Sequence, residues 1–87
     1  NYSAVIEAAK KADLYDDLVR YLQMARKKAR EWKIETELAY SLAKIGKLNE
    51  LTDFISGPNY ARIQDVGDRC FEEGLFEAAR ILFSNNN

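Results

Sequence analysis

The densest group of charged side chains in this 87-residue sequence lies between residues 26 and 33. Its cations are Arg26, Lys27, Lys28, Arg30 and Lys33. Such a run can bind phosphate groups or an acidic protein, and some runs act as nuclear localisation signals. A structural alternative is a cation-rich helix C-terminus, which the helix dipole favours, balanced by Glu31, Glu35 and Glu37. We favour the structural alternative and keep the five cations as candidate partner-facing residues, for an acidic protein rather than a nucleic acid.

No other set of residues indicates chemistry. Histidine is absent, which removes the commonest general base and metal ligand. The single cysteine, Cys70, lies on an apolar stripe and is predicted to be a small core residue. Carboxylate pairs such as Asp16-Asp17 and Glu72-Glu73 are typical of solvated helix faces. The sequence therefore predicts no enzyme, no cofactor and no catalytic or metal site.

Composition sets limits on fold and partners. The sequence is 47% hydrophobic and 31% charged, which is typical of a folded domain rather than a disordered chain. Its formal net charge of −1 provides no global field to attract nucleic acid or an anionic membrane. No apolar run approaches the roughly 20 residues of a membrane helix, so we expect no membrane insertion.

The clearest structural pattern is a helical hairpin over residues 34–55. Apolar residues recur every three or four positions on both sides of Gly46, as in two amphipathic helices. Gly46 can end the first helix in the left-handed conformation. Gly57-Pro58 ends the second, because proline lacks the N–H donor.

The same pattern extends over the rest of the chain. Helices are expected over residues 2–12, over about 15–29, from an N-cap at Asn59 to Gly74, and over 75–83. The segments that begin at Tyr15, Leu48 and Phe76 can be superposed with offsets of 33 and 28 residues.

An internal repeat of this kind predicts an all-α fold: an α-solenoid, or superhelix, of about three stacked hairpins and six short helices. The hairpins are expected at roughly 2–29, 34–56 and 59–84, as one fragment of a longer array. Two residues should mark close packing. Trp32 is expected to be wedged between hairpins, and Gly67 to allow a close approach to a neighbouring helix.

Several stretches resemble one known family. YLQMARKKARE (residues 21–31), ETEL (35–38), FISGPN (54–59) and VGDRCF (66–71) resemble the leg of the clathrin heavy chain, and the similarity covers nearly the whole sequence. This resemblance implies the clathrin heavy chain repeat fold. It also implies a structural role in the coat of transport vesicles, in intracellular protein transport and endocytosis.

The resemblance also implies partners and a location. The expected partners are other clathrin heavy chain legs and a clathrin light chain, without nucleic acid. The expected location is cytoplasmic, on the cytosolic face of coated pits and coated vesicles. The alternative function is a helical-repeat adaptor that binds an acidic partner through the cluster at residues 26–33.

Overall fold

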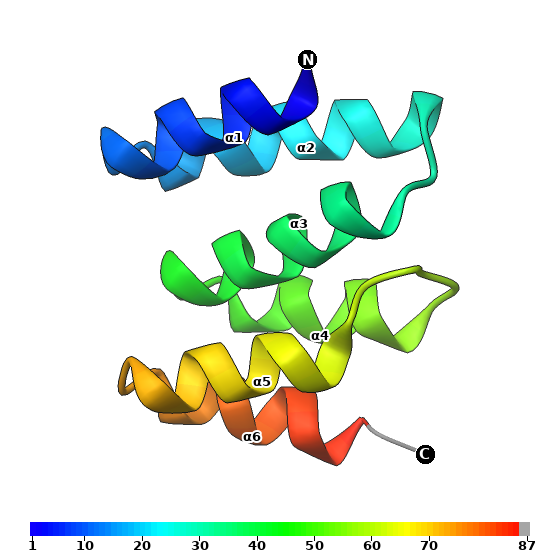
Figure 1. The fold of residues 1–87 in the computed structure, drawn as a ribbon. Helices are drawn as coiled ribbons and strands as arrows, with labels where there is room; N and C mark the ends of the chain where they lie inside the picture. Colours follow the sequence, from blue (N-terminus) through cyan, green and yellow to red (C-terminus); the bar gives the residue numbers. More distant parts are fainter. Residues whose placement is uncertain (86–87) are drawn as a thin grey trace.

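Six α-helices make up the fold in the computed structural model, which describes residues 1–85 (Figure 1). Their bounds are α1 (Tyr2–Lys11), α2 (Tyr15–Lys28), α3 (Trp32–Lys44), α4 (Leu48–Ser56), α5 (Ile63–Glu72) and α6 (Phe76–Ser84). The prediction of an all-α fold with six short helices is confirmed. None of the helices within residues 1–85 has the length and apolar character needed to cross a membrane.

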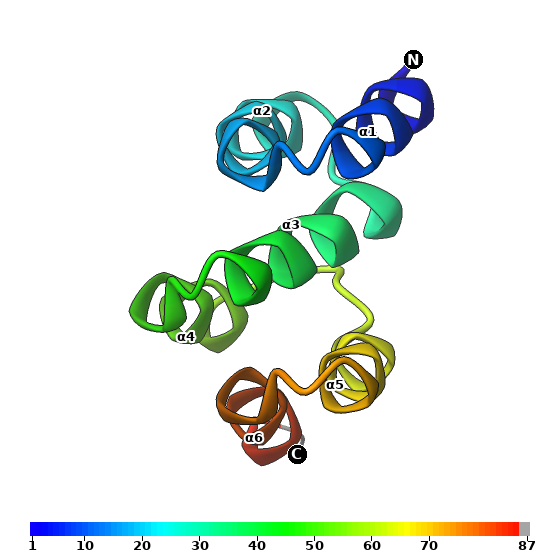
Figure 2. The same ribbon diagram turned by 90° about the vertical axis from the view of Figure 1, so that its left-hand side faces the viewer.

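The helices form three layers, each of which is a hairpin of two consecutive helices. The α1–α2, α3–α4 and α5–α6 hairpins follow one another down the stack (Figures 1 and 2). Between layers, α3 packs against α2 and α5, and α4 packs against α6. The predicted stack of three hairpins is therefore present, with α3 in contact with helices of all three layers.

The three hairpin turns share one backbone conformation. Asp13, Gly46 and Gly74 all have positive φ, at 57°, 76° and 82°. In each turn the next residue donates its N–H to the carbonyl five residues earlier, as Lys47 does to Leu42 at 3.0 Å. This is the Schellman ending of a helix, in which a left-handed residue lets the last carbonyls find donors. The turns explain why the repeat offsets of 33 and 28 residues carry over to the observed starts of α2, α4 and α6.

The core is continuous through the stack and is centred on α3. Leu18 and Leu22 of α2, Leu38 and Leu42 of α3, and Leu82 of α6 are all buried. Nine of the thirteen residues of α3 are buried, including the polar residues Glu35, Thr36 and Ser41. Such burial follows from the position of α3, because neighbours on three sides leave it little solvent-exposed face.

Gly67 makes the close contact that the sequence predicts. A Cβ atom at Gly67 would lie 2.6 Å from Cε1 of Phe83, which belongs to α6. Because carbon atoms do not approach so closely, a side chain at position 67 would displace the phenyl ring. The glycine thus leaves room for the Phe83 ring of α6 to pack against α5.

Two local predictions are wrong. Asn59 is not a helix N-cap, because α5 begins at Ile63 with Arg62 as its N-cap residue. The Asn59 side chain instead closes a turn, accepting the N–H of Ala61 and donating to the carbonyl of Gly57. Trp32 is not wedged between hairpins: it is the first residue of α3 and remains 43% exposed.

Candidate functional site

The main polar site of the structure is centred on Glu35, in the first turn of α3. This side chain is fully buried, yet both of its carboxylate oxygens have partners. Arg30 donates its Nε–H to Oε2 at 2.6 Å, and the Nε of Arg26 lies 3.6 Å from the same oxygen. The backbone N–H of Tyr60 donates to Oε1 at 2.8 Å. A carboxylate can be buried at acceptable cost only with such charged and hydrogen-bonding partners.

The Glu35 site joins segments from three parts of the chain. Arg26 lies near the end of α2, Arg30 lies in the α2–α3 loop, and Tyr60 lies in the α4–α5 loop. A guanidinium N–H of Arg30 also reaches the carbonyl of Pro58 at 3.3 Å. Thr36, adjacent to Glu35, accepts the N–H of Arg62 on its hydroxyl at 2.9 Å. These bonds hold residues 57–62 against α3 in a non-helical conformation, and this explains why α5 begins later than the sequence predicts.

A second polar site on α3 also connects all three layers. Glu37 lies between a cation from the layer before and one from the layer after. The Nζ of Lys10, on α1, lies 3.6 Å from Oε1, and Arg69, on α5, donates to Oε2 at 3.2 Å. Because the Glu37 side chain is mostly shielded from water, these pairs are screened less than exposed ones.

Tyr40, one turn further along α3, extends this second site. Its buried hydroxyl donates to Oε1 of Glu73, and the guanidinium of Arg69 lies 3.9 Å from its ring centroid. Burial, followed by the bond to Glu73, raises the pKa of Tyr40 well above its ordinary value. The same hydroxyl, donating its proton, lowers the pKa of Glu73, and Lys44 at 3.5 Å adds to the effect. At neutral pH the pair is therefore a neutral phenol donating to a carboxylate.

The structure divides the predicted basic cluster into two groups. Arg26 and Arg30 face Glu35, and the guanidinium of Arg26 also lies 4.7 Å from the ring centroid of Phe54. The side chains of Lys27, Lys28 and Lys33 are exposed, and within residues 1–85 none of the three forms an ion pair. The cluster therefore does not form one continuous basic surface.

Cys70 lies in the core, fully buried on α5. Burial raises the pKa of its thiol to about 11, with a smaller contribution from the Glu73 carboxylate. A thiol of this kind is almost entirely protonated at neutral pH and is a poor nucleophile. The prediction of a core cysteine is confirmed.

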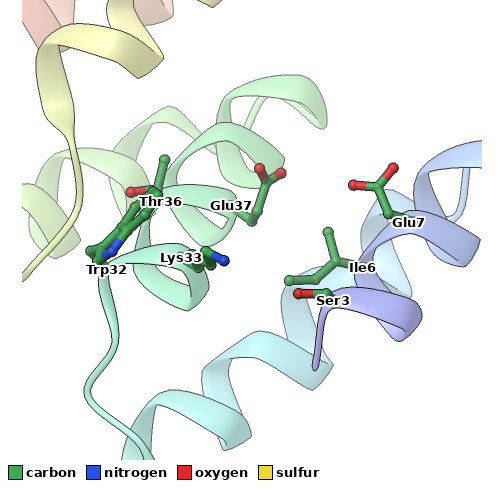
Figure 3. Close-up of a pocket in the computed structure, with 7 residues that line it drawn as sticks. All are labelled: Ser3, Ile6, Glu7, Trp32, Lys33, Thr36 and Glu37. Carbon is green, nitrogen blue, oxygen red and sulfur yellow. The ribbon is translucent and has the colours of Figure 1, made fainter. Parts of the chain in front are cut away.

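Two hollows of the surface lie beside Trp32. One of about 290 Å³ lies between α1 and α3 (Figure 3), and its lining residues are Ser3, Ile6, Glu7, Trp32, Lys33, Thr36 and Glu37. A second, of about 480 Å³, lies against the two inter-hairpin loops, and its lining includes Trp32 and Tyr60. In the described part of the chain, no three potential metal ligands of the His, Cys, Asp or Glu type come together.

Sequence reasoning missed the function of Glu35, Thr36 and Tyr40 in joining the layers. On a helical wheel these residues fall outside the apolar stripe, on faces that are usually solvent-exposed. The run ETEL does contain one usable signal: it places two glutamates on different faces just after a basic cluster. That spacing predicts ion pairs, but not which loops they hold.

Comparison with known proteins agrees with this geometry. The family model described as "Region in Clathrin and VPS" matches residues 1–87. The chain is 56% identical to human clathrin heavy chain 2 over 85 residues, which is 98% of this chain and 5% of that protein. It is 56% identical to the clathrin heavy chain of Drosophila melanogaster over 84 residues, and 42% identical to the probable clathrin heavy chain of Schizosaccharomyces pombe over 85. The two aligned regions cover 97% and 98% of this chain, respectively, and 5% of each relative.

The match of the family model to the whole sequence, with relatives at this identity from animals to yeast, decides the assignment. The chain spans about one twentieth of the length of these relatives. The stack of helical hairpins is consistent with this match, and the chain belongs to the clathrin repeat family.

Proposed function

We propose that this chain is a structural segment of a vesicle-coat scaffold, a strut in the leg of a clathrin heavy chain. The observation that carries the proposal is the bonding of α3 to both neighbouring layers. Glu37 pairs with Lys10 of the first hairpin and Arg69 of the third. The hydrogen bond from Arg69 is directional and helps to fix the angle between layers, and the longer ion pair with Lys10 adds Coulomb attraction, whereas apolar contacts alone allow sliding. A strut needs such fixed angles because the rotation between successive layers determines its overall curvature.

We also propose that the three hairpins belong to a longer array. The equivalent positions of the repeat support this extension. Phe71 is 58% exposed, but its equivalent one hairpin earlier, Ala43, is 3% exposed because the third layer covers it. Val5 is 39% exposed, but its equivalent Leu38 is 1% exposed under the first layer. Further hairpins on both sides would cover these positions in the same way.

The partners and location follow from this proposed function. Other heavy chain legs would contact the sides of the strut, and each contact would be weak, so that coat stability arises from many contacts together. A clathrin light chain is the second partner, and Lys27, Lys28 and Lys33 are the exposed cations proposed to face partners. The protein would act on the cytosolic face of coated pits and vesicles, without catalysis.

A chimaera tests the proposed function. The matching segment of the Drosophila heavy chain is replaced by these 87 residues, and assembly is measured by sedimentation and electron microscopy. We expect coats in yields similar to those of the unmodified heavy chain, because 56% identity should preserve both layer-to-layer interfaces. Light chain binding is measured on the same chimaera.

The control is the same chimaera with Glu35→Ala, which removes the buried carboxylate between layers. This variant should assemble less well, whereas Asp68→Ala, at an exposed position of α5 outside the inter-hairpin loops, should not differ from the parent. A folded parent chimaera that forms no coats would contradict the proposal. The adaptor alternative gains no support, because Arg26 and Arg30 are occupied by Glu35.

A further inference from the structure

The two edges of the stack carry opposite charge. All three hairpin turns lie on one edge, and both inter-hairpin loops lie on the other (Figure 1). We name these the turn edge (residues 10–17, 44–50 and 71–77) and the loop edge (residues 26–35 and 56–65). The turn edge has seven Asp and Glu residues against four lysines. The loop edge has six Lys and Arg residues against three carboxylates, so the two edges attract each other electrostatically.

The loop edge contains a hollow with the composition of a protein-binding site. Its volume is about 480 Å³, and it is lined by Trp32, which is 43% exposed, and Tyr60, which is 57% exposed, together with Arg30, Glu31 and Lys33. The guanidinium of Arg62 covers one face of Trp32, at 3.9 Å from the ring centroid. Exposed Trp, Tyr and Arg side chains are the types that dominate interface energetics. Within residues 1–85, neither Lys33 nor Arg62 forms an ion pair, so both are available to an acidic partner.

The turn edge contains a projection that matches this hollow. At the α1–α2 turn, Leu14 is half exposed and lies between Asp13 and Tyr15 in the sequence. Asp13 and Asp16 are exposed and form no ion pair in the described part of the chain, whereas Asp17 pairs with Arg20. This turn tip (residues 13–17) therefore presents one apolar side chain flanked by unpaired carboxylates.

We propose that the turn tip of one copy docks into the loop-edge hollow of a second copy. Leu14 would contact the rings of Trp32 and Tyr60. Asp13 and Asp16 would face Lys33 and Arg62. The proposal rests on the proposed scaffold function, in which copies run side by side, and it names the surfaces that meet.

The arrangement of the two surfaces determines the kind of assembly. Since they lie on opposite edges of the same molecule, each copy can use both at once with different neighbours. Such heterologous contacts produce open rows rather than closed dimers. The contact is small, so we expect weak association that depends on salt.

Charge reversal in the 87-residue chain tests the contact. One variant carries Lys33→Glu and Arg62→Glu, and a second carries Asp13→Lys and Asp16→Lys. Self-association is measured by sedimentation equilibrium and ¹⁵N chemical shifts. The measurements are made at about 0.02 M salt, where charges are weakly screened, and at about 0.3 M salt, where they are strongly screened. We expect each variant alone to associate at least about fivefold more weakly than the parent at low salt. A mixture of the two should regain association, because each hollow then meets a tip of opposite charge.

Controls separate this contact from other causes. Arg80→Glu changes an exposed charge in α6, on neither surface, and should leave association within about twofold of the parent. Leu14→Ser should weaken association without changing charge or the turn residue Asp13. Circular dichroism checks that every variant is folded.

Two results would overturn the proposal. If salt and charge reversal had no effect, association would come from the apolar end layers. If the loop-edge variant lost association and mixing did not restore it, the hollow would serve an acidic partner other than the turn tip. Either result leaves the coat-assembly test of the wild-type chimaera unaffected, so the two failures are distinguishable.

Discussion

Replacement of Glu35 by glutamine provides the sharpest test of how the layers are held together. Glu35→Gln keeps the size of the side chain and an oxygen that can accept the N–H of Tyr60. It removes the negative charge that faces Arg30 at 2.6 Å and Arg26 at 3.6 Å. Two guanidiniums then lie beside a neutral amide, with no counter-charge in the buried site. We expect a clear loss of stability, with the hairpins still formed.

The magnitude follows from the contacts. A hydrogen bond to a charged group contributes about 1.5–3 kcal/mol. The Arg26 contact is too long to be a hydrogen bond and adds only Coulomb attraction. Arg30 is 45% exposed, so water partly replaces the lost carboxylate and the cost stays below the 3–5 kcal/mol range of a fully buried pair. We therefore expect a loss of about 2 kcal/mol, or roughly 8–16 °C in Tm for a chain of this size.

Urea denaturation followed by circular dichroism measures this loss. Glu31→Gln is the matched control, because Glu31 is exposed and forms no ion pair within residues 1–85, and its effect should stay within about 0.5 kcal/mol. A double-mutant cycle with Arg30→Gln should give a coupling energy of at least about 1 kcal/mol. If Glu35→Gln cost no more than Glu31→Gln, the buried carboxylate would not stabilise the stack, and the reasoning would be refuted.

Three further predictions concern the turns and the core. Asp13→Gly should raise stability by about 0.5–1 kcal/mol in the same urea assay, because Asp13 occupies a left-handed conformation that glycine adopts without steric cost; a loss would contradict this. Gly67→Leu should lower stability by about 2 kcal/mol through the clash with Phe83, and adding Phe83→Ala should recover part of the loss; an unchanged Tm for Gly67→Leu would remove the argument. Cys70, whose pKa is raised to about 11, should react with thiol reagents at pH 8 only as fast as the chain unfolds; rapid labelling of the native protein would show that the thiol is accessible.

The sequence was sufficient for the architecture because the decisive signals are local. The apolar periodicity identified all six helices, and Gly46 and Gly74 marked two of the hairpin turns. Asp13 shows why the superposition of repeats was more informative than residue type alone. Asp adopts the left-handed conformation less readily than glycine does, yet its equivalence to Gly46 places it in the same Schellman turn.

The start of α5 could not be predicted because its cause is not local. Asn59 is a good N-cap residue by propensity, and the chain after Gly57-Pro58 could begin a helix there. The N–H groups of Tyr60 and Arg62 instead donate to side chains of α3, about 25 residues earlier in sequence. A tertiary bond thus overrides a local preference, and only the packed structure reveals which donor meets which acceptor.

The polar residues of α3 give a strut something that its apolar contacts cannot supply, a defined angle between layers. An apolar interface between two layers is tolerant of small rotations, because dispersion and burial change little over a few degrees. Glu35 accepts a hydrogen bond from Arg30 in the α2–α3 loop, and Glu37 accepts one from Arg69 on α5. Each of these bonds weakens steeply as its geometry changes. Burial therefore supplies most of the stability of the stack, and the polar residues select one angle between layers from the many that burial allows. In a long array this selection matters at every joint, since an angular error at one layer displaces all of the layers that follow it.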